Sequence, residues 1–280
     1  MSDTTSPAAG PDRTGPAGRV DTTVAHPARR YNYWLGGKDN FAADRASGDQ
    51  VAAVFPTVKR AARENRTFLR RTVGFLAREA GIRQFLDIGT GLPTADNTHQ
   101  IAQRIAPESR IVYVDNDPLV MSHARALLTS SPEGRSAYIE RDLREPGSIL
   151  DAPELHATLD LTRPVGLTLV AILHFVRDFE DPYGVVGRLV RALPAGSYLV
   201  MSHGTYDGLP AEAVAKLEAA NAATGGLSQP RSREEFSRFF TGLDLVEPGV
   251  VPVGDWRPES GAEPPEPVDI CMYGAVARIP

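Results

Sequence analysis

The sequence is poor in several features that mark particular classes of protein. Its 280 residues include one cysteine, Cys271, so neither a disulfide within the chain nor a cysteine-based metal site is expected. No run is long and apolar enough to span a bilayer, and the first residues, MSDTTSPAAGPDRTGPAG, lack the apolar core of a signal peptide. The net charge of −5 gives no excess of positive charge for coating nucleic acid or a membrane surface. We therefore expect a cytoplasmic protein with no metal, nucleic-acid or membrane partner.

The composition is that of a globular protein. Hydrophobic residues make up 42% and charged residues 23%, and the length fits one large domain with an extension. Residues 1–20 hold too few large apolar groups to offset the entropy of ordering, so they predict a disordered tail. Residues 21–80 combine the aromatic-rich stretch ARRYNYWLGGKDNFAADRA with two helical patterns and predict a helical N-terminal cap or lid. Residues 81–280 predict the main domain.

In that main domain, apolar runs alternate with helical stretches. Runs of this kind are typical of strands buried on both faces of a parallel sheet, so the fold class is a doubly wound α/β sandwich. The predicted strands are 84–88, 110–115, 136–141, 165–171 and 196–202, and the predicted helices are 94–106, 117–129, 183–193, 211–224 and one that opens near Ser232. Two late runs, 243–247 and 269–278, predict a hairpin at the sheet edge.

The stretch QFLDIGTGLPTADNTHQ, residues 84–100, predicts a ligand-binding loop between a strand and a helix. No lysine follows its glycines, which excludes a phosphate-binding loop. A dinucleotide loop needs a third glycine, where this chain has Thr94 after Pro93, so that interpretation is weakened but stays open. Asp87 would repel a pyrophosphate and attract a cation. Asp115 ends the next strand, where a carboxylate can bind ribose hydroxyls, a feature that NAD-binding proteins share.

These motifs resemble those of a known class of enzymes. D-x-G-x-G, an acid at the end of the next strand, and RDL at the end of the third are similar to class I S-adenosylmethionine-dependent methyltransferases. YNYWLGGKDNFAADR, FLDIGTGLPT, VYVDNDP and AILHFVRD resemble more closely the actinobacterial S-adenosyl methyltransferase family, first catalogued as a domain of unknown function. The resemblance covers roughly residues 25–280. It implies a Rossmann-like methyltransferase fold with a seven-stranded, mostly parallel sheet, an antiparallel edge strand and a helical N-terminal cap.

The resemblance also implies a cofactor, S-adenosyl-L-methionine, with S-adenosyl-L-homocysteine as its product, and a small-molecule methyl acceptor that reacts through oxygen or nitrogen. Residue by residue, it implies that the methionine end lies against Asp87, Gly89 and Gly91, the ribose diol on Asp115, the adenine against Asn116, Asp142 and Leu143, and the sulfonium near Ala171. Pro93 stands where many methyltransferases have a third glycine, which leaves the path of the loop open.

Each motif has a simpler structural alternative. The 87–91 stretch could be a tight turn with a helix-capping acid, Asp115 could cap the helix that begins near Pro118, and Asp142 could be a surface acid. Two wider alternatives stay open for the whole protein: an NAD(P)-dependent oxidoreductase, and a non-catalytic S-adenosylmethionine-binding protein.

The candidate catalytic residue is His174, which follows the fourth predicted strand. A neutral imidazole there could accept a proton from a hydroxyl nucleophile, or the residue could be structural. His203 is a second candidate of similar standing. Because methyl transfer often needs only alignment and desolvation, the reaction could also proceed without a general base.

The N-terminal segment contains two further groups. The aromatics Tyr31, Tyr33, Trp34 and Phe41 are either core or a lid over the acceptor pocket, with Gly36 and Gly37 as its hinge. A second group, Lys59, Arg63, Arg66 and Arg70, shares one helical face. This face could bind phosphate or be solvated, and we favour the solvated alternative; one of these arginines could still reach the cofactor's carboxylate. Cys271, in the final apolar run, predicts inert core.

Overall fold

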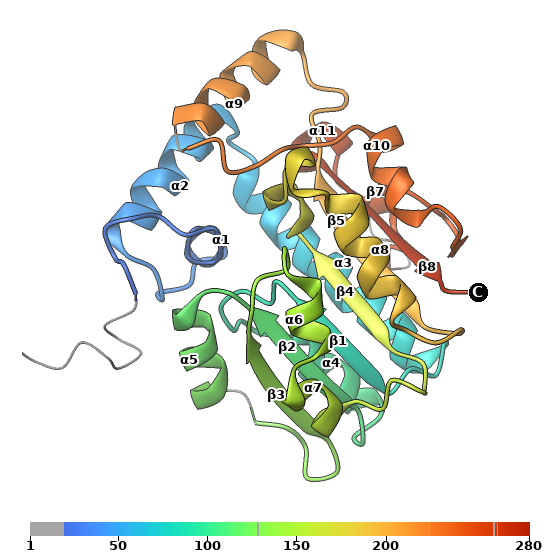
Figure 1. Cartoon of the computed structure of the whole chain (residues 1–280). Coiled ribbons are helices and arrows are strands. Elements are labelled where there is room, and N and C mark those ends of the chain that lie inside the picture. Colours follow the sequence, from blue (N-terminus) through green and yellow to red (C-terminus); the bar gives the residue numbers. More distant parts are fainter. Residues whose placement is uncertain (1–19, 128, 224, 260, 262) are drawn as a thin grey trace, which may run out of the picture.

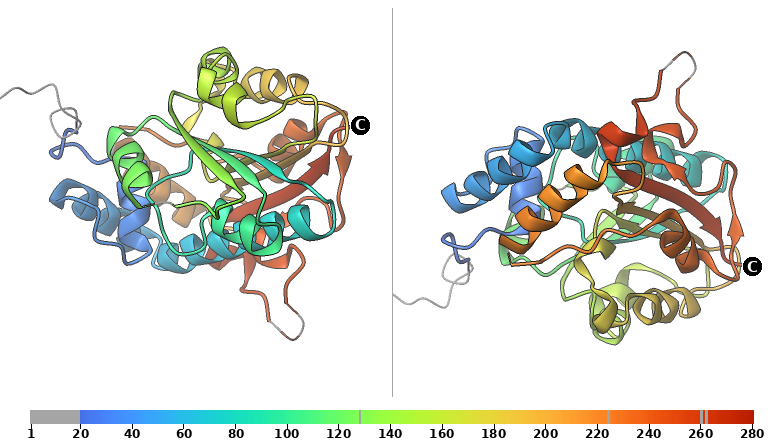
Figure 2. Two further views of the ribbon diagram at one scale, coloured as in Figure 1. Left: turned by 90° about the horizontal axis from the view of Figure 1, so that it is seen from below. Right: turned by 90° about the horizontal axis from the view of Figure 1, so that it is seen from above.

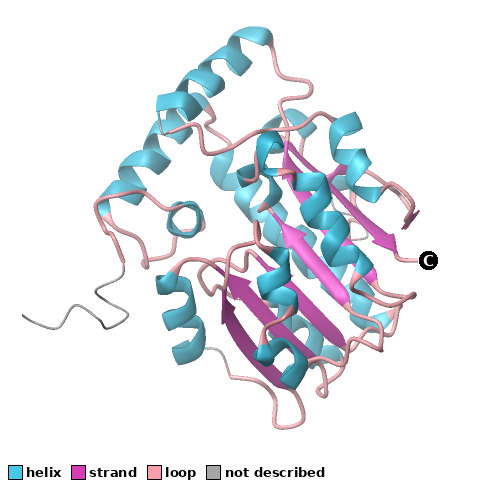
Figure 3. Ribbon diagram, in the orientation of Figure 1, coloured by secondary structure: helices cyan, strands magenta, loops and turns pink. Residues whose placement is uncertain are grey.

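The computed structural model describes residues 20–280 except 128, 224, 260 and 262. The tail predicted over residues 1–20 lies outside the described residues, apart from Val20. One sheet lies between two layers of helices, with further helices beyond the carboxyl ends of its parallel strands (Figures 1 and 3). No helix of the described chain is long and apolar enough to cross a membrane.

The sheet has the order β3-β2-β1-β4-β5-β8-β6, with β7 paired to β8 off this path. The strands β1 to β5 pair in parallel, and β8 runs antiparallel to β5, β6 and β7. The strand bounds are β1 Gln84–Ile88, β2 Arg110–Asp115, β3 Arg135–Glu140, β4 Gly166–Val170, β5 Tyr198–Gly204, β6 Asp244–Leu245, β7 Val251–Pro252 and β8 Met272–Arg278. The predicted doubly wound, mostly parallel sheet is confirmed.

The sheet has eight strands where seven were predicted. The run 243–247 pairs only at Asp244–Leu245, and the chain turns before Val251–Pro252 pairs with the other end of β8. One predicted strand is therefore replaced by two short ones. Between β7 and β8 the described part of the chain includes a loop that protrudes from the molecule (Figure 2).

Helices cover both faces of the sheet (Figure 2). The helix bounds are α1 Pro27–Trp34, α2 Ala42–Val54, α3 Val58–Arg78, α4 Thr98–Ile105, α5 Pro118–Leu127, α6 Pro146–Leu150, α7 Pro153–Thr158, α8 Pro182–Arg191, α9 Ala211–Ala223, α10 Arg233–Ser237 and α11 Pro267–Ile270. The described chain also contains four 3₁₀ turns: η2 Leu173–Phe175, η3 Asp178–Glu180, η4 Arg238–Phe240 and η5 Val253–Asp255.

The two faces of the sheet support two apolar clusters. On one face, α6, α7, α8, α10 and η4 pack against side chains such as Leu86, Val112 and Leu167. On the other face, α3, α4 and η5 pack against side chains such as Phe85 and Ile111. Because successive side chains of a strand point to opposite faces, β1 and β2 must be apolar at nearly every position. This explains why their bounds could be predicted from unbroken apolar runs.

The long helix α3 belongs to the second of these layers. Phe68, Val73 and Leu76 are fully buried on the face that it turns toward the sheet, and each contributes roughly 1.5–3 kcal/mol by leaving water. The preceding helices α1 and α2 lie beyond the carboxyl ends of the strands, where α2 packs beside α9 (Figure 1). The division of the chain at residue 80 stays a prediction.

Candidate functional site

A cavity of about 550 Å³ lies at the carboxyl ends of β1, β2 and β4. The strand order reverses between β1 and β4, and open α/β sheets bind their ligands at such a point. Helices α1, α2, α3 and α9 supply the outer wall. Of the residues singled out from the sequence, the lining contains Tyr31, Trp34, Arg66, Asp87, Gly89, Gly91, Asp115, Asn116, Asp142, Leu143, Ala171, His174 and Cys271.

The glycine loop has the conformation that its glycines permit. Gly89 and Gly91 have φ angles of +76° and +68°, in the region that residues with a Cβ adopt at a cost. A Cβ on Gly89 would lie 2.6 Å from Ile172 Cγ1, whereas one on Gly91 would meet no atom within 4 Å. Gly89 is thus required by packing as well as by its backbone angle, and Gly91 leaves open space at the cavity wall.

Asp87 fastens the end of β1 to its neighbours. Thr98 Oγ1 donates to its Oδ2 at 2.6 Å, and Thr168 Oγ1 donates to its Oδ1 at 2.8 Å. Burial raises the pKa of this carboxyl, against the effect of the two hydroxyls and of the Arg66 charge. A carboxylate has about four acceptor sites, so Asp87 can still accept from a cationic group in the cavity.

Asp115 fastens the glycine loop to the end of β2. Its Oδ2 accepts from Gly91 N at 2.8 Å and its Oδ1 from Asp117 N at 3.0 Å. Burial raises its pKa to about 6. The helix-capping alternative belongs instead to Asp117, whose Oδ1 accepts from Leu119 N in the first turn of α5. Asp115 therefore presents its remaining acceptor sites to the cavity.

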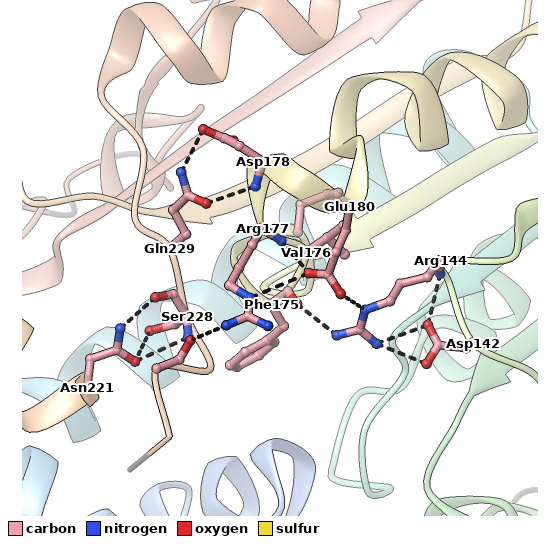
Figure 4. Close-up of polar contacts among 12 residues, drawn as sticks. Asp142, Arg144, Phe175, Val176, Arg177, Asp178, Glu180, Asn221, Ser228 and Gln229 are labelled. Carbon is pink, nitrogen blue, oxygen red and sulfur yellow. Dashed lines mark hydrogen bonds and ion pairs between the residues drawn. The ribbon is translucent and has the colours of Figure 1, made fainter. Parts of the chain in front are cut away.

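Asn116 and Asp142 are joined across the carboxyl ends of β2 and β3. Asn116 Nδ2 donates to Asp142 Oδ2 at 3.0 Å. Arg144 donates to both oxygens of Asp142 and extends to Glu180 Oε1 at 2.6 Å and to the carbonyl oxygen of Phe175 at 3.0 Å (Figure 4). Asp142 is thus the first member of a polar network that reaches the segment after β4.

The wall near β4 contains an unusual backbone position. Ala171 has a φ of +55°, a conformation that costs a residue other than glycine about 1–3 kcal/mol. Its N–H donates to Ser202 Oγ at 3.0 Å, and Ser202 Oγ donates to Asn65 Oδ1 at 2.6 Å. Asn65 Nδ2 donates in turn to the hydroxyl of Tyr31 at 3.0 Å. This chain of bonds joins β4, β5, α3 and α1 around the cavity.

His174 lies in η2, directly after β4, and faces the cavity. Its Nδ1 is buried without a hydrogen-bond partner among the described residues. Burial, together with the charges of nearby His203, Arg30 and Arg231, holds the pKa of His174 well below its usual value. The imidazole is therefore neutral at pH 7, and no described residue uses the lone pair of its unprotonated ring nitrogen.

His203 is placed differently, and it does not line the cavity. Its Nδ1 is 2.8 Å from the carbonyl oxygen of Gly204, and its Nε2 is 2.8 Å from Arg231 Nη1. Because an arginine only donates, Nε2 is the acceptor and Nδ1 carries the proton. Burial lowers the pKa of His203 to about 3. Both ring nitrogens are committed to the protein, so His203 is not available as a base.

Four other residues predicted at the lid lie outside the lining: Tyr33, Gly36, Gly37 and Phe41. Tyr33 donates through its hydroxyl to Asp49 Oδ1 on α2 at 2.7 Å, and Gly36 and Gly37 form the turn that ends α1. A Cβ on Gly37 would collide with the side chain of Asn32. Gly37 is therefore required by local packing and Gly36 by its φ of +82°, and neither lies in the cavity lining.

The basic residues of α3 and Cys271 also differ in whether they line the cavity. Lys59, Arg63 and Arg70 are exposed, as expected for a solvated face, whereas Arg66 lines the cavity and donates to the carbonyl oxygen of Asp96 at 2.9 Å. Cys271 precedes β8 and ends α11 instead of lying in the strand. It borders the cavity, and burial raises the pKa of its thiol to about 11, as suits an unreactive thiol.

Two buried arginines were missed by the sequence reasoning. Arg231 donates to the carbonyl oxygens of Leu173 and Val176 and to Asp178 Oδ1, and so fixes the segment that carries His174. Arg30 lines the cavity from α1. Neither belongs to a local motif that signals its burial, so only the tertiary structure reveals them.

The donor set fits a cationic, phosphate-free nucleoside. Two buried carboxylates, Asp87 and Asp115, face the cavity beside the glycine loop, which has no lysine for a phosphate. The described residues also contain no cluster of three or more histidine, cysteine or acidic side chains that could hold a metal. Fold and site together define a Rossmann-like methyltransferase fold with a pocket suited to S-adenosylmethionine.

Comparison with known families agrees with this class. The chain belongs to the S-adenosyl methyltransferase family, which matches residues 13–280, and its cofactor is S-adenosyl-L-methionine. The resemblance recognised in the motifs is confirmed. No curated protein matches the chain.

Two solved structures are similar over nearly the whole chain. A DUF574 family protein from Streptomyces avermitilis MA-4680 is 53% identical, with a TM-score of 0.90 over 94% of this chain and 100% of its own. A proposed methyltransferase from Thermobifida fusca YX is 42% identical, with a TM-score of 0.84 over 92% of this chain and 96% of its own.

Proposed function

We propose that this protein transfers a methyl group to an oxygen or nitrogen atom of a small molecule that binds in the cavity beside the cofactor. The observation that carries the proposal is the neutral His174 at the cavity wall, with ring acceptor capacity that no described residue uses. The cavity volume lies within the range of small-molecule sites, roughly 300–1,000 Å³.

The cofactor would be held by residues at the carboxyl ends of β1, β2 and β3, near the point where the strand order reverses. Asp115 would accept the ribose hydroxyls, while Asn116, Asp142 and Leu143 would border the adenine. Asp87 and Arg66 would face the ammonium and the carboxylate of the methionine end. When bound, S-adenosylmethionine supplies an electrophilic methyl group on a sulfonium.

His174 would act on the acceptor. A ring nitrogen of His174 would accept the hydroxyl proton of the acceptor as the acceptor oxygen is methylated. Positioned general bases of this kind contribute typically ~10²–10⁴-fold. The walls formed by α1, α2 and α9 would exclude water once ligands fill the cavity, and this would strengthen the electrostatic interactions at the reacting atoms.

Binding and turnover test the proposal separately. Calorimetry should show S-adenosylhomocysteine binding with micromolar affinity, and ligand at about 100 times its Kd should raise the free energy of unfolding by roughly 2.7 kcal/mol. NAD should do neither. Binding of NAD without S-adenosylhomocysteine would favour the oxidoreductase alternative. S-adenosylhomocysteine binding without methylation of any acceptor in a broad panel would favour a non-catalytic binding protein.

A further inference from the structure

Arg30 is a buried cation on the cavity wall. Its side chain extends from α1, and the residue is 8% exposed. Among the described residues its guanidinium makes one hydrogen bond, from Nη1 to Ser47 Oγ at 3.2 Å, and its Nε is buried without a partner. Its charge also lies 5.5 Å from the centre of the Trp34 ring. No carboxylate oxygen of the described residues lies within ion-pair distance, 4.0 Å.

The neighbouring arginine of the same helix shows the contrast. Arg29 is equally buried, at 5% exposed, but it does not line the cavity. Its Nε lies 3.4 Å from Asp117 Oδ2, and its Nη1 lies 3.9 Å from Asp44 Oδ2 and donates to the carbonyl oxygen of Asp21 at 2.9 Å. Thus α1 pairs the arginine that points away from the cavity and leaves the one that faces it unpaired.

An unpaired buried cation is costly, because desolvating a charge is offset only by a close counterion and by hydrogen bonds. A guanidinium has five N–H donors, and the described residues accept from only one of those of Arg30. A ligand anion in the cavity would supply the missing partner. Nearby Asp44 already offsets part of the charge of Arg30, so a monoanion fits better than a phosphate dianion.

The surroundings of Arg30 define the rest of the ligand. Trp34, Val51, Phe55 and Leu217 line the same cavity from α1, α2, the end of α2 and α9. These side chains suit a flat apolar body. His174 is near enough for the charge of Arg30 to affect its pKa. An anion beside Arg30 would offset that charge and make the imidazole a stronger base.

We propose that the methyl acceptor is a small aromatic acid whose carboxylate pairs with Arg30 and whose hydroxyl or amino group faces His174. This inference rests on the proposed function, since it assigns the substrate class of the same site. It also gives Arg30 a role different from that of Arg66, which lies at the methionine end near Asp87.

The test compares matched acids and amides as ligands. The protein is saturated with S-adenosylhomocysteine, and the affinities of 4-hydroxybenzoate, 4-hydroxycinnamate and the corresponding neutral amides are measured by NMR titration. Charge-assisted hydrogen bonds are worth about 1.5–3 kcal/mol, so each acid should bind roughly 10- to 100-fold more tightly than its amide. Arg30→Gln should remove that preference, and Arg30→Lys should retain part of it. Arg45→Gln, on the exposed face of α2, is the matched control and should behave as wild type.

Other outcomes would overturn the inference. These are equal affinity of acid and amide for the wild-type protein, no binding of either acid, or an acid preference that survives Arg30→Gln. A large loss of S-adenosylhomocysteine affinity in Arg30→Gln with a native melting profile would assign Arg30 to the cofactor's carboxylate instead. Failure of the wild-type protein to bind S-adenosylhomocysteine would count against the proposed function. The acid–amide comparison without cofactor would then still decide the role of Arg30.

Discussion

Asp115→Asn separates the cofactor role of this residue from its structural role. In the folded protein, burial raises the pKa of Asp115 from 3.8 to about 6. One pKa unit corresponds to about 1.4 kcal/mol, so keeping this carboxylate ionised above pH 6 costs the folded state on the order of 3 kcal/mol. Asparagine removes that cost. However, its single oxygen can accept from only one of Gly91 N and Asp117 N, and an unsatisfied buried N–H costs roughly 1–3 kcal/mol. The two effects offset each other, so we expect little change in the melting temperature at pH 7.

Cofactor affinity should respond quite differently. The ionised carboxylate accepts two ribose hydroxyls in the proposed complex, and bonds to a charged group are worth about 1.5–3 kcal/mol. Asp115→Asn should therefore weaken S-adenosylhomocysteine binding by roughly one to two decades at pH 7.

The pH dependence follows from the direction of the pKa change. The raised pKa means that the folded protein holds a proton on Asp115 that the unfolded chain has released, between pH 3.8 and about 6. Stability relative to Asp115→Asn therefore falls as the pH rises through this window and is constant above it. The wild-type affinity for S-adenosylhomocysteine should be constant above about pH 6 and should fall below it, to roughly a tenth near pH 5. The affinity of Asp115→Asn should lack this pH dependence, because asparagine does not titrate.

Calorimetric titrations from pH 5 to pH 8 on both proteins, with thermal unfolding of each, measure both quantities. A folded Asp115→Asn protein with wild-type affinity would refute the assignment of the ribose to Asp115. A large drop in its melting temperature would show that the bonds to Gly91 and Asp117 are the main role of the residue.

Three further predictions concern other parts of the cavity. Gly89→Ala should destabilise the protein by about 2–4 kcal/mol, because it combines a left-handed backbone angle with a close contact to Ile172. Gly91→Ala should cost only about 1–2 kcal/mol and should mainly weaken cofactor binding. Equal melting temperatures of the two variants would contradict this. With an acceptor in hand, His174→Ala and His174→Gln should both lower turnover at least ~10²-fold with unchanged cofactor affinity, and activity restored by glutamine would mean that the residue only orients the acceptor. Residues 28–45 should exchange amide hydrogens more slowly when S-adenosylhomocysteine is bound, because α1 forms part of the cavity wall; equal exchange with and without ligand would make the segment ordinary core.

The sequence predicted those parts of the fold that local patterns determine. Strands β1 and β2 were placed to the residue because both of their faces are buried, and Asp87 and Asp115 stood out as acids at strand ends. The short helices α6 and α7 were missed, since five and six residues give too little periodicity to recognise. Contacts such as Ser202 with Asn65, 137 positions apart, leave no local trace. The pair Gly36 and Gly37 ends α1 and lies outside the cavity lining, so its role as a hinge stays a prediction.

One short segment of chain, residues 173–180, is hydrogen-bonded to both the Asp142 side and the Gln229 side of the protein. Residues 173–180, which include His174, are held on one side by Arg144, which joins Asp142 to the carbonyl oxygen of Phe175 and to Glu180 (Figure 4). On the other side, the Gln229 side chain exchanges two hydrogen bonds with Asp178, and Gln229 N donates to the carbonyl oxygen of His174 at 2.7 Å. Because bonds to a shared partner are energetically coupled, the position of the His174 imidazole depends on the bonds of both Arg144 and Gln229. The same polar network that borders the proposed adenine site therefore also fixes the position of His174, the proposed base.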